Sequence, residues 1–120
     1  MSDRSLRILG IALALVASAI HFTLFAVDLI PGESTTVPAF AAMGLGFLAC
    51  AAILALGPRD LYPLVLLYAG SLVFAWVATR GTYPIEIFGV TSKVAEVGLG
   101  LITVALMRAP TRRVGAPSRR

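Results

Sequence analysis

A lysine and a glutamate lie three residues apart inside the apolar segment "GVTSKVAEVGLG", residues 89–100. On a helix, side chains at i and i+3 share a face, so Lys93 and Glu96 can form an ion pair. The single histidine, His21, is of the one residue type that ordinarily exchanges a proton near neutral pH. Ionisable groups are costly inside a membrane and often mark proton or ion pathways. These residue types therefore point to a structural ion pair or to a proton or ion site.

The depth of each residue along its helix predicts which side chains meet. At about 1.5 Å per residue, Lys93 lies roughly 10 Å below the outer surface of a membrane, and Glu96 lies near the midplane. His21 reaches about the depth of Lys93 from the other side, and Ser71 reaches that of Glu96. If the first and last helices adjoin, as in an up-and-down bundle, we expect one buried polar cluster of His21, Ser71, Lys93 and Glu96.

The composition requires a membrane around these residues. Of the 120 residues, 58% are hydrophobic and 13% are charged, and a soluble chain this short could not bury so much apolar surface. Four apolar stretches are each long enough to cross a hydrocarbon core of about 30 Å. We expect helices at about 6–30, 38–56, 61–79 and 85–107, within a single membrane domain covering residues 1–120. Alternation typical of barrel strands is absent, so the predicted fold is all-α, a transmembrane four-helix bundle.

The N-terminal segment allows a second interpretation. Arg4 and Arg7, an apolar run and Ala17-Ser18-Ala19 also fit a cleavable signal peptide. The apolar run continues through "IHFTLFAV" without a polar break. We therefore expect a retained helix.

The basic residues predict the orientation. Eight of the ten Lys and Arg residues fall on one side of the predicted topology: Arg4, Arg7, Arg59, Arg108, Arg112, Arg113, Arg119 and Arg120. Because basic loops stay in the cytoplasm, we expect both termini to be cytoplasmic in a multi-pass plasma-membrane protein. The basic tail, residues 109–120, is expected to be disordered and to attract anionic lipids, with Arg108, Arg112 and Arg113 contacting head groups. The net charge of +4 then needs no nucleic-acid partner.

Small residues recur on one face of each predicted helix. Small side chains let helices approach closely inside a membrane, where packing replaces the hydrophobic effect. We expect four glycines to serve this purpose: Gly10, Gly46, Gly89 and Gly100.

Several chemistries find no support in the sequence. It has no glycine-rich phosphate loop, no GxSxG or HExxH motif and no Cys/His metal framework. Cys50, the only cysteine, is expected to be a small core residue. We therefore predict no enzyme activity, no cofactor and no metal.

Four segments carry a family resemblance: "AIHFTLFAVD", "GLGFLACAAILALG", "RDLYPLVLLYAGSLVFAWV" and "GVTSKVAEVGLGLITVAL". Over most of residues 8–107 the chain resembles a family of small four-helix membrane proteins, best represented in halophilic archaea, that has no assigned activity. His21 and Lys93 are its chemically distinctive residues. That family often has an aspartate before the lysine and a glutamine near the position of Glu96, where this sequence has Ser92 and Glu96. The resemblance implies the fold and no activity.

Two functions fit these residues. The first is a structural or accessory membrane protein, either a homo-oligomer or a small subunit of a larger complex, in which Lys93 and Glu96 neutralise each other and His21 helps to fix helix register. The alternative is a small proton- or ion-coupled transporter that uses His21, Lys93 and Glu96. We expect the first, because a matched ion pair needs no substrate to explain it.

Overall fold

The computed structural model describes residues 1–29, 32, 34–79 and 85–110. Regular structure in these residues is helical throughout: α1 (Asp3–Ala26), α2 (Pro38–Leu56), the short 3-10 helix η1 (Arg59–Leu61), α3 (Tyr62–Ala78) and α4 (Ile87–Arg108). Four of the helices are long and apolar enough to cross a membrane, with η1 and α3 counting as one span. The predicted all-α fold with four candidate membrane helices is confirmed.

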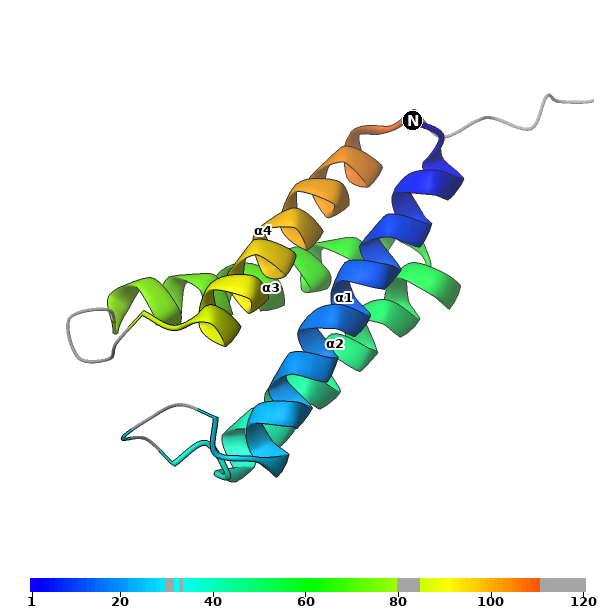
Figure 1. Ribbon diagram of the computed structural model, residues 1–120. Helices are drawn as coiled ribbons and strands as arrows, with labels where there is room; N and C mark the ends of the chain where they lie inside the picture. Colours follow the sequence, from blue (N-terminus) through cyan, green and yellow to red (C-terminus); the bar gives the residue numbers. More distant parts are fainter. Residues whose placement is uncertain (30–31, 33, 80–84, 111–120) are drawn as a thin grey trace, which may run out of the picture.

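The first helix lies at the centre of the bundle. It packs against both α2 and α4, while α3 packs mainly against α4 and touches α2 only slightly. Figure 1 shows the α1–α2 pair and the α3–α4 pair meeting near the N-terminus and separating toward the ends of α1 and α3. The expected adjacency of the first and last helices is therefore present, and it brings His21 and Glu96 within reach of each other.

The bounds of α1 differ from the expected 6–30. The helix begins at Asp3 because the hydroxyl of Ser2 accepts a hydrogen bond from the backbone N–H of Ser5, at 3.1 Å. It ends at Ala26 because the buried hydroxyl of Thr35 donates to the backbone oxygen of Leu24, at 2.5 Å. The Asp28 carboxylate accepts the Thr35 backbone N–H at 2.7 Å. The expected end at residue 30 was wrong, because a residue beyond the helix supplies its C-terminal cap.

The remaining helices begin and end close to the expected positions. The second helix spans Pro38–Leu56 as predicted, with proline in its first turn and Gly57 at its C-terminal end. The fourth helix begins at Ile87, two residues later than expected. Here Glu86 is the N-cap, and its carboxylate accepts the backbone N–H groups of Phe88 and Gly89 at 2.6 and 2.5 Å. This arrangement matches the preference for negative charge at a helix N-terminus.

Two arginines fasten the end of the bundle at which α1 begins, which we call the arginine end. The guanidinium of Arg7 donates to two backbone oxygens in the last turn of α2, at 3.0 and 2.9 Å. The guanidinium of Arg59 donates to the backbone oxygen of Ala109 at 2.9 Å and pairs with Asp3 at 2.5 Å. Arginine has five donors in a fixed fork, which suits it to unpaired carbonyl groups at helix ends. The two side chains join all four helices at this end.

Glycine permits two close crossings of α2. At Gly46, an added Cβ would overlap the Tyr68 hydroxyl, which donates to the Met43 backbone oxygen at 2.9 Å. At Gly44, an added Cβ would lie 2.9 Å from the ring of Phe22. Gly44 belongs to the α1–α2 contact.

The other three predicted packing glycines differ in role. At Gly10, a Cβ would lie 3.0 Å from a methyl group of Leu54, so this glycine does serve a helix contact. At Gly89, an added Cβ would overlap the capping carboxylate of Glu86 and would lie 3.2 Å from the indole nitrogen of Trp76. This glycine therefore makes room for the helix cap as well as for α3. At Gly100 it would lie 3.6 Å from Leu66, an ordinary contact. Close approach therefore does not require glycine at position 100.

We expect Gly46→Ala to destabilise the protein by about 1–3 kcal/mol, because the new methyl group displaces Tyr68 and breaks its bond to Met43. The measurement is the free energy of unfolding in mixed detergent micelles. Gly70→Ala is the matched control, since an added Cβ there has no atom within 4 Å. Equal stabilities of the two variants would contradict the proposed crossing.

Candidate functional site

Glu96 is the centre of a polar cluster buried between α4 and α1. Its side chain is fully buried, and both carboxylate oxygens accept hydrogen bonds. The Lys93 ammonium donates to Oε1 at 2.6 Å and to Oε2 at 2.5 Å. The Ser92 hydroxyl donates to Oε1 at 2.6 Å. All three side chains belong to α4, so the negative charge is neutralised within its own helix.

His21 approaches this carboxylate from α1. Its Nδ1 lies 2.8 Å from the backbone oxygen of Ala17, one turn earlier. Its Nε2 lies 4.0 Å from Oε1 of Glu96, too far for a hydrogen bond. The ring of Phe47 lies beside the imidazole at a centroid distance of 5.4 Å, and that of Phe40 at 6.2 Å. The imidazole therefore occupies an aromatic environment and faces the carboxylate across a short gap.

Lys93 reaches the cluster from the side of α4 that faces α3. Its side chain lines an apolar groove of about 330 Å³ between α3 and α4, together with Trp76 and several valines. It is 13% exposed, whereas the side chain of Glu96 is not exposed at all. The aliphatic part of the lysine can thus lie along an apolar surface while the ammonium turns inward to its counter-ion. Lys93 is the most exposed of the three charged or titratable members.

Ser71 does not join this cluster. It is exposed, and its hydroxyl donates to the backbone oxygen of Tyr68 in its own helix, at 2.8 Å. The structure brings His21, Lys93 and Glu96 together as expected, whereas Ser71 faces outward. Depth along a helix does not determine which way a side chain faces. Ser92 occupies the role expected of Ser71. The i, i+4 spacing of Ser92 and Glu96 is a sequence signal that could have identified it.

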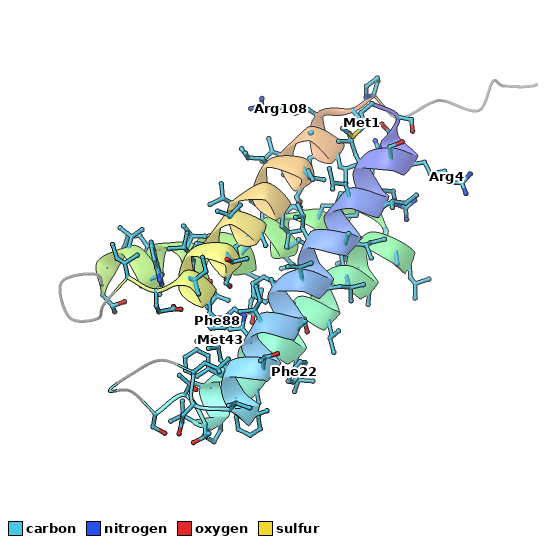
Figure 2. All side chains as sticks on the ribbon, viewed as in Figure 1. Met1, Arg4, Phe22, Met43, Phe88 and Arg108 are labelled. Carbon is cyan, nitrogen blue, oxygen red and sulfur yellow. The ribbon has the colours of Figure 1, made fainter. Side chains whose placement is uncertain are left out.

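Of the three arginines predicted to contact lipid head groups, Arg108 lies within the described residues. Arg108 is exposed at the arginine end, and so is Arg4. Figure 2 shows both side chains projecting away from the bundle. Arg112 and Arg113 lie outside the described residues. Arg7 and Arg59 bind helix ends, whereas the side chains of Arg4 and Arg108 are exposed at this end.

Polar side-chain atoms that are shielded from solvent are hydrogen-bonded. Over residues 1–29, 32, 34–79 and 85–110, every side-chain nitrogen or oxygen atom with no exposed surface has a hydrogen-bond partner. In the same part of the chain, no group of three or more His, Cys, Asp or Glu side chains is arranged to hold a metal ion. The arrangement neutralises the buried charge of Glu96 and places an imidazole beside it.

Comparisons of the chain with protein-family models, curated proteins and solved structures gave no match. The resemblance to small four-helix membrane proteins stays a prediction.

We expect Ser92→Ala to destabilise the protein by about 1.5–3 kcal/mol, because it removes a hydrogen bond to a buried carboxylate. Ser71→Ala makes the same chemical change on an exposed surface, and we expect an effect within about 0.5 kcal/mol. Unfolding of both variants in the same micelles provides the comparison. A larger loss for Ser71→Ala would contradict the assignment of Ser92 to the cluster.

Proposed function

We propose that this protein is a structural or accessory membrane protein, either a homo-oligomeric scaffold or a small subunit of a larger membrane complex. The observation that supports this proposal is the closed hydrogen bonding of Glu96. Lys93 and Ser92 bind both of its oxygens, and its side chain has no exposure. A site that receives substrate usually keeps polar groups open to it, whereas the ion pair here is complete without one.

The surface of α3 supports the idea of an assembly. Only Tyr62, Val65 and Ala69 of this helix are buried within the chain. Leu67 is 69% exposed and Phe74 is 74% exposed. Membrane helices associate by packing and hydrogen bonding, and lipid can cover the same surface. Because it is the least buried of the four candidate spans, this helix is the surface on which we propose that another copy or another subunit packs.

We further propose that the arginine end faces the cytoplasm of the plasma membrane, with both termini on that side. The support is the positive-inside rule applied to Arg4, Arg7, Arg59 and Arg108, together with the basic tail. Anionic lipid head groups are the proposed contacts of Arg108 and of the tail residues Arg112 and Arg113.

The test of the structural role is a pair of substitutions. Glu96→Leu leaves the Lys93 ammonium without its counter-ion, and we expect a loss of about 3–5 kcal/mol in the free energy of unfolding. Replacing both partners, Lys93→Met with Glu96→Leu, removes both charges from the apolar interior. Because an apolar replacement of a buried pair is often neutral or stabilising, we expect the double variant to recover most of that loss.

Native mass spectrometry of the same samples reports their assembly, which we expect the double variant to retain. A double variant that folds but no longer assembles would show that the charges also take part in assembly. A double variant as unstable as Glu96→Leu would contradict the structural role of the pair.

A proton- or ion-coupled transporter is the second candidate, and the position of His21 favours it. The imidazole Nε2 lies 4.0 Å from the Glu96 carboxylate, so two groups able to carry a proton are close together. Lys93 lies between this pair and the groove at α3, and its partial exposure offers a way toward the surface. Such an arrangement is typical of proton relays within membranes.

The two candidates differ in proton flux. We expect wild-type protein reconstituted in liposomes, and Glu96→Gln at matched folded incorporation, both to show only the background flux of protein-free vesicles. A flux in the wild type that Glu96→Gln abolishes without unfolding would favour the transporter over the structural protein.

A further inference from the structure

The geometry of His21 determines where its ring can bind a second proton. A backbone carbonyl only accepts hydrogen bonds, so the 2.8 Å contact with Ala17 requires the proton of the neutral ring to lie on Nδ1. The lone pair is then on Nε2, which faces Oε1 of Glu96 at 4.0 Å. A proton taken up by the imidazole therefore binds to Nε2, the ring nitrogen that faces the Glu96 carboxylate.

The neighbours of the ring determine how a positive charge is received. From α4, Glu96 is the facing carboxylate, and Lys93 is the cation already bound to it. From α2, the rings of Phe40 and Phe47 lie beside the imidazole, and aromatic rings attract cations. Tyr68 of α3 lies behind Phe47 at a centroid distance of 5.1 Å. The buried thiol of Cys50 belongs to the same core.

A small approach of His21 to Glu96 is enough to link α1 to α4 by a hydrogen bond. The short hydrogen bonds of the cluster lie within α4, and none of those found among the described residues joins a side chain of α1 to one of α4. An N–H···O bond needs about 2.9 Å, so Nε2 and Oε1 must approach by about 1 Å. Ser92 and Lys93 can keep their bonds to the carboxylate during such a shift, since a carboxylate has about four acceptor positions.

We propose that Nε2 of His21 is a proton-binding site whose counter-ion is Glu96, and that proton binding creates a direct hydrogen bond between α1 and α4. The Lys93–Glu96 pair alone is neutral, so protonation of His21 gives the cluster a net charge of plus one. The cluster then consists of two cations and one carboxylate. The carboxylate bridges Lys93 and His21 in this state. The inference rests on the proposed structural role of the cluster and adds its regulation by protons.

The test uses the fact that His21 is the only histidine in the chain. Protein labelled with ¹⁵N-histidine and ¹³C-glutamate, reconstituted in lipid bilayers, gives one imidazole to follow by solid-state NMR across a pH titration. We expect the neutral ring to carry its proton on Nδ1. On acidification we expect Nε2 to gain a proton, and the distance between Nε2 and the Glu96 carboxyl carbon to shorten by about 1 Å.

Two variants separate the role of Glu96 from general effects of charge. At the pH at which the wild-type ring is half protonated, we expect Glu96→Gln to reduce the protonated fraction about tenfold. Asp60→Asn, at the arginine end, should leave that fraction unchanged. If Glu96→Gln does not fold, the wild-type measurements still decide the proposal.

A neutral ring with its proton on Nε2 would overturn the inference, as would protonation without shortening of the distance to Glu96. The proposed structural role would survive either result, because it depends on the unfolding of Glu96→Leu and of the double variant. Conversely, a proton on Nε2 with a shortened distance would stand even if those stabilities were unaffected.

Discussion

The ion pair between Lys93 and Glu96 is the interaction on which the interior of this protein depends. An isolated carboxylate would be too costly to bury between two membrane helices. Here both partners belong to α4, so the helix carries its own neutralised pair into the bundle. Ser92 binds one of the same oxygens. This self-contained arrangement allows α1 to close over a charged residue.

The two ends of the bundle are held together in different ways. At the arginine end, Arg7 and Arg59 bind carbonyl groups at the ends of α2 and α4, and so attach neighbouring helices through their backbones. Farther along, α1 meets α2 where the Ser18 hydroxyl donates to the Gly44 backbone oxygen at 2.8 Å. The contact of α1 with α4 near His21 has no comparable hydrogen bond among the described residues. Apolar packing holds that contact, and we propose that protonation of His21 adds a hydrogen bond to it.

The sequence predicted the four long helices and the relative depth of His21, Lys93 and Glu96. The length of the apolar stretch and its flanking residues Pro38, Gly57 and Pro58 predicted the bounds of α2. The rise per residue of a helix predicted that His21 lies at the level of Lys93. The end of α1 could not be predicted, because its cap comes from Thr35, nine residues beyond Ala26. Long-range caps leave no local pattern.

Rotation about the helix axis was the second quantity that the sequence left open. Ser71 was assigned to the cluster from its depth, yet it faces outward from α3. The role of Arg7 and Arg59 was also missed, since a basic residue near a membrane end is explained equally well by topology. Only the packing of the helices distinguishes a cation that meets lipid from one that caps a neighbouring helix.

We infer that the Lys93–Glu96 pair keeps α1 closed on α4 at the level of His21. The most direct test measures two spin-label distances in a Cys50→Ala background, with and without Glu96→Leu. One label pair, at Ala26 and Thr91, reports the cluster, and the other, at Leu9 and Ala105, reports the arginine end; all four positions are exposed. We expect Glu96→Leu to lengthen and broaden the first distance and to leave the second unchanged. Two unchanged distances would contradict it.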